Sequence, residues 1–275
     1  MDRDIAAHYE LGHEADRLDT WGRLERERTL ELLERHLPPA PADVLDVGGG
    51  PGAYAVRLAR AGYAVRLVDP VELHVEQARA ASAAQPDAPL AGAETGDARE
   101  LPAGDASFDA VLLLGPLYHL QEAADRMRAL REAARVLRPG GVVAVAAISR
   151  FASTIDGLLR ARLTEPGFEA VLERGVRDGR HVNPDPVGHP HWFTTAFLHR
   201  PEELAGEVRA ASFELDALLA IEGVGAFLAD ASPWLDDPVR RELLMRAIRR
   251  VEAEPALLGA SPHLLAVGRA RANLD

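Results

Sequence analysis

Glycine and aspartate residues follow the apolar runs in the first half of this sequence, and both residue types suit the binding of a polar ligand. A glycine-rich turn, 48–52, comes directly after the apolar run 44–47. Glycine there lets the chain turn sharply and lets the backbone approach a ligand closely. Asp69 follows a second apolar run and Asp97 follows a third. We expect both carboxylates to accept hydrogen bonds, Asp69 from the hydroxyls of a ribose and Asp97 from an exocyclic amine.

Two classes of ligand fit such a turn, a dinucleotide and a cationic nucleoside. Gly48-x-Gly50-x-x-Ala53 matches the dinucleotide-binding fingerprint, and Asp69 stands near the required distance. Asp46, inside the end of the preceding apolar run, repels a pyrophosphate and suits a cationic group. The last part of the sequence predicts a helix and one further strand, not a second mononucleotide-binding half. We therefore favour a cationic nucleoside, with an NAD-dependent reductase as the alternative.

Helical and strand patterns alternate along the chain, which is typical of an α/β fold with a mostly parallel sheet. The expected strands are 44–47, 64–68, 90–94, 108–114, 142–148, 213–221 and 263–267. The expected helices are an N-terminal segment to about residue 37, then 53–60, 72–84, 122–137, 201–211 and 238–253. Ligands of such sheets bind outside the carboxyl ends of the strands. The glycine turn and both aspartates follow strands, so we expect them at one edge.

The composition excludes several kinds of chemistry. The chain has 275 residues, no Cys and 31 basic residues, all of which are Arg. Without Cys there is no disulfide, no Cys nucleophile and no thiolate zinc site. Without Lys there is no Schiff base and no ordinary P-loop lysine.

Charge and hydropathy exclude further partners. The net charge of -12 argues against nucleic acid or an anionic membrane as the main partner, because both favour clustered positive charge. The longest apolar run, about 142–148, is far shorter than the ~20 residues of a membrane helix. The first ten residues lack the pattern of a secretory signal. We expect a soluble cytoplasmic protein.

The run 44–52, Val-Leu-Asp-Val-Gly-Gly-Gly-Pro-Gly, resembles motif I of the class I S-adenosylmethionine-dependent methyltransferases. Asp69 and the segments 96–98, 108–114 and 137–141 resemble the later motifs in the right order. The resemblance covers residues 43–150 and is closest to the UbiE-like (type 11) small-molecule branch. It implies S-adenosylmethionine as cofactor, with S-adenosylhomocysteine as product. It also implies a doubly wound, Rossmann-like sheet of seven strands, in which the last strand is antiparallel and lies between two parallel ones.

The same resemblance implies a role for each matched residue. Asp46 and Gly48 would hold the methionine part of the cofactor, and Gly50 and Gly52 would line the turn. Asp69, followed by Pro70, would bind the ribose hydroxyls. The remaining implied cofactor contacts are Asp97 and Ala98 at the adenine, and the backbone carbonyls of Leu114 and Gly115 at the methionine amino group.

Methyl transfer of this kind is an in-line displacement, which needs alignment and the exclusion of water more than covalent catalysis. A base is needed only when the acceptor must lose a proton. His119 is our candidate, because histidine titrates near neutrality; the alternative is that it orients substrate or caps a helix. Tyr118 either faces the sulfonium through a cation–π contact or packs. The stretch 115–118 lacks the Asn/Asp-Pro-Pro-aromatic pattern of nucleobase N-methyltransferases, which argues against a nucleobase acceptor.

Four histidines, His181, His189, His191 and His199, gather in the segment after the fifth strand. His189-x-His191 could share a metal ion, but Asp185 is the one nearby acid in sequence and Pro190 constrains the pair. We expect no metal, and a polar wall of the substrate pocket that includes His191, or a plain surface loop. On the N-terminal helix, Tyr9 either touches cofactor or substrate or belongs to a solvated helix.

We therefore expect one methyltransferase domain, 1–275. It transfers a methyl group to an oxygen, nitrogen or carbon atom of a small molecule, such as a secondary metabolite. Its parts are an N-terminal helical lid (1–37), a cofactor-binding core (43–150), a substrate-cap insertion after strand five (151–192) and a segment that completes the sheet (193–271). A homo-oligomer is compatible with this, because lid helices of the family sometimes exchange between subunits. A module that binds S-adenosylmethionine without catalysis is the second alternative.

Overall fold

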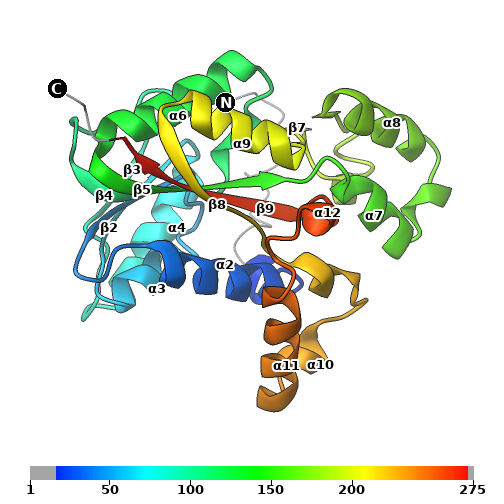
Figure 1. Ribbon diagram of the computed structural model, residues 1–275, viewed down its shortest axis with the longest axis horizontal. Coiled ribbons are helices and arrows are strands. Elements are labelled where there is room, and N and C mark those ends of the chain that lie inside the picture. Colours follow the sequence, from blue (N-terminus) through cyan, green and yellow to red (C-terminus); the bar gives the residue numbers. More distant parts are fainter. Residues whose placement is uncertain (1–16, 272–275) are drawn as a thin grey trace.

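A seven-stranded sheet forms the centre of the computed structural model, which describes residues 17–271 (Figure 1). Tyr9 lies outside the described residues. The strands are β1 (Asp43–Val47), β2 (Ala64–Asp69), β3 (Gly92–Thr95), β4 (Phe108–Leu113), β5 (Leu137–Ile148), β8 (Phe213–Ala220) and β9 (His263–Ala270). Their order is β3-β2-β1-β4-β5-β9-β8. The pairs among β1 to β5 are parallel, and β9 is antiparallel to both β5 and β8. The expected Rossmann-like sheet with an antiparallel last strand is confirmed.

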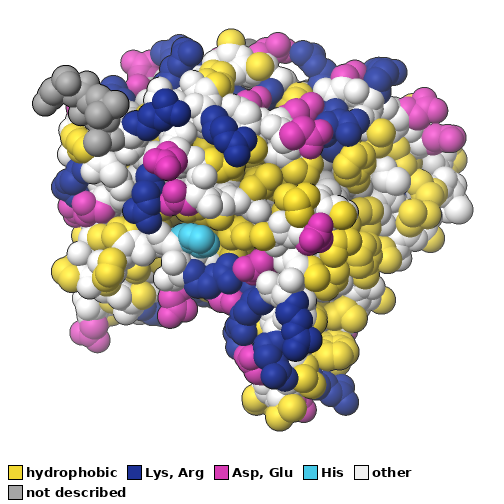
Figure 2. Space-filling model, viewed as in Figure 1, with side chains coloured by type: hydrophobic (Ala, Val, Ile, Leu, Met, Phe, Trp, Pro, Cys, Tyr) yellow, Lys and Arg dark blue, Asp and Glu magenta, His cyan; other side chains and the backbone are white. Residues whose placement is uncertain are grey.

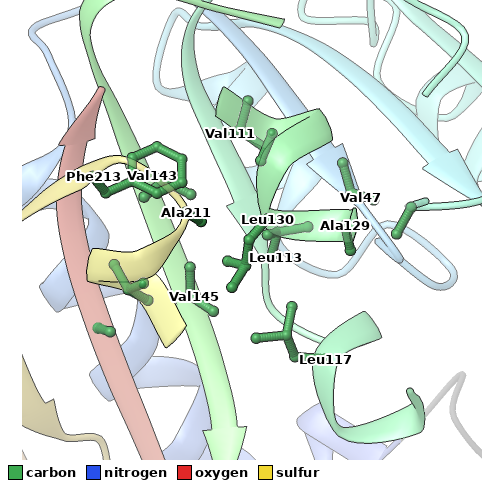
Figure 3. Close-up of a cluster of buried hydrophobic side chains, with 14 of the residues drawn as sticks. Val47, Val111, Leu113, Leu117, Ala129, Leu130, Val143, Val145, Ala211 and Phe213 are labelled. Atoms are coloured by element: carbon green, nitrogen blue, oxygen red, sulfur yellow. The ribbon is translucent and has the colours of Figure 1, made fainter. Parts of the chain in front are cut away.

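Helices cover both faces of this sheet, because alternate residues of each strand point to opposite sides. Leu45 and Val47 belong to a core cluster with α6 (Ala123–Val136) and α9 (Pro201–Ala210), and Figure 3 shows side chains of this cluster. Val44 belongs to a second core cluster on the other face. That cluster contains residues of the helices α2 (Arg23–His36), α3 (Ala55–Arg60) and α4 (Glu72–Ala83).

The order of the strands reverses beside β1, since the chain runs outward from β1 through β2 to β3 and then returns to place β4 on the other side of β1. Loops that leave the carboxyl ends of strands at such a switch point diverge and open a crevice. The short helix α5 (Pro116–His119) follows β4 there. Sequence reasoning did not predict α5, and Pro116 at its first turn suits a helix start.

A separate small structure follows β5 and extends to Phe197. It contains the helices α7 (Ala152–Leu159), η2 (Arg162–Thr164), α8 (Phe168–Asp178) and η3 (Pro190–Trp192), and the two-stranded sheet of β6 (Arg180–His181) and β7 (Ala196–Phe197). Phe168, Val171, Leu172 and Trp192 form its own buried cluster. The expected loop 181–191 therefore begins on a strand and ends in η3. We call residues 151–197 the cap.

Between β8 and β9 the chain forms a group of helices, the middle of which extends away from the sheet (Figure 1). It contains η4 (Gly223–Phe227), α10 (Ser232–Leu235), α11 (Pro238–Arg249) and α12 (Pro255–Leu258), whereas one helix, 238–253, was expected. Arginines gather on α11 (Figure 2), and two of them pair with glutamates of α2: Arg241 with Glu27 and Arg249 with Glu31. Within residues 17–271, no helix has both the length and the apolar character needed to cross a bilayer.

Candidate active site

A cavity opens at the carboxyl edge of the sheet, beside the switch point, and its walls come from the loops after β1, β2, β3 and β4. It is lined by eleven residues that the sequence singled out: Asp46, Gly48, Gly50, Asp69, Pro70, Asp97, Ala98, Leu114, Gly115, Tyr118 and His119. Gly52 is not among the lining residues, because a side chain there would point at Ala78 of α4. His191 lies in the cap instead, next to Glu165. The structure thus brings together most of the predicted set.

The glycine turn brings the backbone to the cavity in a conformation that other residues resist. Gly48 has φ +67° and Gly50 has φ +56°. A Cβ on Gly48 would lie 2.9 Å from Cδ of Pro116, closer than carbon atoms pack. The Gly48 N–H donates to the Val68 carbonyl at 2.7 Å, which ties the turn to β2. The turn is therefore held close to α5, with no room for a side chain at Gly48.

Asp46 is a fully buried carboxylate at the end of β1, and it lines the cavity. Neither of its oxygens has a hydrogen-bond partner among the residues that the structure describes. Burial, together with the nearby charge of Asp69, raises its pKa to about 7. A buried carboxylate without a partner is costly, and a cation in the cavity would remove much of that cost.

Asp69 holds the glycine turn in place from the end of β2. One of its oxygens accepts from the Gly50 N–H at 2.9 Å, and the other accepts from the Val71 N–H at 2.9 Å. Nδ1 of His74 lies 3.1 Å from the second oxygen. Each carboxylate oxygen has two lone pairs, so Asp69 retains capacity to accept from a ligand. Sequence reasoning anticipated the carboxylate but not His74, which also lines the cavity.

Asp97 after β3 has a partner that the sequence analysis missed. Arg99 donates to both of its oxygens, at 2.9 and 2.7 Å, and also to Asp125 at 3.0 Å. These hydrogen bonds from Arg99 lower the pKa of Asp97 to about 2, so the carboxylate stays ionised at neutral pH. Arg99 lines the cavity as well. The i, i+2 spacing of the two residues is a sequence signal that could have indicated the pair.

Tyr118 and His119 stand on α5 at the lip of the cavity, where they meet the cap. Their rings make an edge contact, with centroids 4.7 Å apart. Nδ1 of His119 lies 3.4 Å from the Thr195 carbonyl oxygen, a long hydrogen bond in which the ring nitrogen donates. The tautomer that makes this bond has an unprotonated Nε2, which is the form a general base requires.

Phe193 of the cap completes an aromatic group with these two rings, at centroid distances of 6.5 Å from Tyr118 and 6.0 Å from His119. Its backbone has φ +70°, a conformation that L-residues resist and that costs roughly 1–3 kcal/mol. Asn183 donates to the Phe193 carbonyl at 2.9 Å, and Nε2 of the buried His181 donates to the Trp192 carbonyl at 2.6 Å. These bonds hold Phe193 against the lip. Sequence reasoning missed it.

The sequence analysis also missed the wall of the cavity on the side of α2. Arg17, Glu25 and Tyr54 line the cavity there, and Arg17 pairs with Glu25 at 2.5 Å. Nδ1 of His263, the first residue of β9, lies 2.5 Å from Glu222 and 4.0 Å from Glu25. Burial opposes its charge, but the two glutamates raise the pKa of His263 to about 9. This ionic network joins α2 to the sheet under the cavity.

The cavity fits S-adenosylmethionine better than a dinucleotide. The buried Asp46, which has no hydrogen-bond partner in the described part of the chain, suits a sulfonium or ammonium cation and would repel a pyrophosphate. The positive φ angles at Gly48 and Gly50 allow the backbone to approach the ligand. Carboxylates follow both β2 and β3, as hydroxyl and amine groups of an adenosine require.

Comparisons with known proteins agree with this cavity. Residues 45–145 match a family model described as a methyltransferase domain. An uncharacterized methyltransferase of Mycobacterium tuberculosis is 35% identical over 174 residues, which are 62% of this chain and 62% of that protein. The 27-O-demethylrifamycin SV methyltransferase of Amycolatopsis mediterranei is 42% identical over 122 residues, 43% of each chain. The chain thus matches these curated relatives over less than two thirds of their length.

Among solved structures, a SAM-dependent methyltransferase of Methanosarcina mazei has a TM-score of 0.60 and 17% identity, and the alignment covers 88% of this chain and 98% of that one. At this identity the likeness concerns the fold. The cofactor is S-adenosylmethionine, in agreement with the buried carboxylate beside the glycine turn. Residues 45–145 thus match a methyltransferase domain of the type 11 family, and the fold that surrounds them is similar to that of S-adenosylmethionine-dependent methyltransferases.

Proposed function

We propose that this protein transfers the methyl group of S-adenosylmethionine to a small-molecule acceptor, at a hydroxyl, an amine or an activated carbon. The observation that carries the proposal is Asp46, a buried carboxylate beside a glycine turn that has no hydrogen-bond partner within residues 17–271, inside the segment that matches the methyltransferase model. One similar protein is named as an O-methyltransferase of a rifamycin, which supports a secondary metabolite as the acceptor here.

In this proposal the loops after the strands hold the cofactor. Asp46 and Gly48 bind its methionine part, together with the backbone carbonyls of Leu114 and Gly115. The adenosine is bound by Asp69, Pro70, Asp97 and Ala98. When bound, S-adenosylmethionine supplies a methyl group that is activated on a sulfonium sulfur. The protein's remaining work is to align the acceptor and to exclude water.

His119 is the proposed base for an acceptor that must lose a proton. A hydrogen bond from Nδ1 to the Thr195 carbonyl favours the tautomer with an unprotonated Nε2, which takes the proton. Tyr118 and Phe193 orient the acceptor beside it. An acceptor that carries no such proton requires only the orienting role of the three rings.

The N-terminal helices and the cap are the proposed covers of the site. Arg17 and Glu25 on the α2 side line the cavity, and the cap contacts its lip through Thr195 and Phe193. A cover on each side would exclude water from the reacting atoms, which suppresses hydrolysis and strengthens electrostatic contacts. In this division the sheet edge binds the cofactor and the cap selects the acceptor.

The test is incubation of the protein with isotopically labelled S-adenosylmethionine and a panel of hydroxyl, amine and carbon acceptors, followed by mass spectrometry. We expect a labelled product and S-adenosylhomocysteine in equal amounts. His119→Ala should reduce kcat for a hydroxyl acceptor by about 10²-fold or more. Turnover within a few-fold of wild type would exclude an essential base.

Two alternative functions are separated by simpler measurements. A dinucleotide-dependent reductase would be stabilised thermally by NADH, whereas a methyltransferase is stabilised by S-adenosylhomocysteine. A module that only binds the cofactor would give the second result but no labelled product with any acceptor.

A further inference from the structure

Two histidines and a glutamate of the cap converge on one point. Oε2 of Glu165 lies 2.8 Å from Nε2 of His191 and 3.8 Å from Nδ1 of His189. All three groups offer a ligand atom within 4.8 Å of one another. They come from two separate segments, because Glu165 precedes α8 and the histidines flank the start of η3. This removes one of the two reasons for which a metal was not expected, since an acid does approach the histidine pair.

The three side chains are held in place by their neighbours. The ring of His189 stacks on the indole of Trp192, with centroids 4.0 Å apart and planes 10° apart. The buried Trp192 donates from Nε1 to the same Glu165 oxygen at 2.6 Å. Asn183 donates to the His189 carbonyl at 2.8 Å. Ligands whose orientation is set in this way by outer hydrogen bonds and packing bind a metal at lower entropic cost.

We propose that Glu165, His189 and His191 bind a zinc ion. Imidazole nitrogen and carboxylate oxygen are common zinc ligands, at about 2.0–2.2 Å from the metal in tetrahedral geometry. Ligand atoms around such an ion are roughly 3.3 Å apart, and the two separations from the glutamate oxygen lie on either side of that value. Three protein ligands leave the fourth position to water. Arg162 lies near this site, and its guanidinium is already engaged: it forms a salt bridge with Asp156 at 2.8 Å and donates a hydrogen bond to the His191 carbonyl.

A second group of similar composition shows the contrast. Glu25, Glu222 and His263 also bring ligand atoms within 4.8 Å of one another. There two acids share one histidine and an arginine, because Arg17 pairs with Glu25 at 2.5 Å and His263 bonds to Glu222 at 2.5 Å. In the cap group, by contrast, two histidines face one carboxylate, and that carboxylate is partly exposed.

Zinc would act as a clip within the cap. It would join residue 165 to residues 189–191, and Trp192, which follows them, belongs to the buried cluster of the cap. The next residue is Phe193, whose ring faces Tyr118 and His119. The ion would therefore stabilise the segment that the cap presents to the lip of the cavity, at a distance from the reacting atoms.

The experiment uses untagged full-length protein, stripped of metal with a chelator and then dialysed. Zinc is added in competition with a chromophoric chelator, and bound metal is counted by mass spectrometry after gel filtration. We expect one zinc per chain for wild type and a rise in Tm on addition. Glu165→Gln and His191→Ala should lose at least 90% of the bound zinc, and Glu169→Gln, an exposed glutamate of α8, should retain it.

Two results would overturn the proposal. One is the absence of stoichiometric zinc on wild type under this competition. The other is zinc retained by both ligand variants while they bind S-adenosylhomocysteine as wild type does, which shows that they are folded. Because zinc is measured without turnover, a positive result stands even if no methylated product is ever found, and a negative one leaves the proposed activity intact.

Discussion

The sheet edge and the cap build their parts of the site in different ways. At the sheet edge, Asp46 and Asp69 stand at the carboxyl ends of the paired parallel strands β1 and β2, and Gly48 follows β1, so strand pairing brings all three to the cavity. In the cap, Phe193 is held at the lip by hydrogen bonds from Asn183 and His181 to the backbone around it and by packing against a small buried cluster. The sheet edge therefore depends on backbone geometry and the cap on side chains that hold a loop. We expect variants at the sheet edge to change the binding of the cofactor and variants in the cap to change the binding of the acceptor.

The largest effect is expected from the glycine turn. Gly48→Ala combines a positive φ with a contact of 2.9 Å to Pro116, whereas Gly50→Ala has a positive φ but no atom of residues 17–271 within 4 Å of its Cβ. Strain and overpacking should lower the free energy of unfolding of Gly48→Ala by about 2–4 kcal/mol, against about 1–2 kcal/mol for strain alone in Gly50→Ala. Urea unfolding of both variants measures this. Equal losses would contradict the role given to the contact with Pro116.

The next largest effect is expected from the carboxylates at the ends of β2 and β3, Asp69 and Asp97, which should contribute unequally to cofactor affinity. Asp69→Ala removes a buried acceptor that also anchors the turn, and we expect cofactor affinity to fall by about 1.5–3 kcal/mol. Asp97→Ala should cost less, because Asp97 is partly exposed and already paired with Arg99. Calorimetric titration with S-adenosylmethionine measures both. Unchanged affinity of Asp69→Ala would exclude the ribose contact.

Cofactor affinity should also depend on pH through Asp46. With its pKa raised to about 7 by burial and by Asp69, the empty site holds a proton at lower pH. A cationic ligand favours the ionised carboxylate and lowers that pKa, so binding releases the proton. Affinity should therefore rise with pH up to about 7, by at most roughly tenfold per unit. Calorimetry from pH 5.5 to 8 measures the slope, and Asp46→Asn should flatten it; a slope that persists in this variant would assign it to another group.

The smallest effect is expected in the cap. Phe193→Ala retains the strained φ of +70°, and Phe193→Gly relieves it. We expect Phe193→Gly to be more stable than Phe193→Ala by about 1 kcal/mol. Both should raise KM for the acceptor and leave cofactor affinity unchanged, because the ring contacts the lip and not the sheet edge. A large loss of cofactor affinity would contradict the separation of the two regions.

Much of the sheet edge could be predicted because its signals are local. Apolar runs followed by glycine or aspartate indicated the ends of β1 to β4, and the carboxyl ends of parallel strands meet at one edge of a sheet. Arg99 and His74 were missed although they stand two and five residues from predicted acids, because charge pairs at such spacings are common on solvated surfaces. Gly52 was assigned to the cavity from the motif, but its position in the turn directs it toward α4.

The sequence by itself determined the fold, the edge of the sheet at which the cavity opens and the residues at the ends of the strands there. These features depend on the alternating burial of strand residues and on backbone angles that glycine alone adopts readily. Both can be recognised from residues that are adjacent in the sequence. Tertiary structure alone decided which side chains meet at the lip and in the cap. Glu165 stands 26 residues before His191, and Thr195 stands 76 residues after His119. Such contacts depend on how a separate small core packs on the sheet, and no local pattern records that packing.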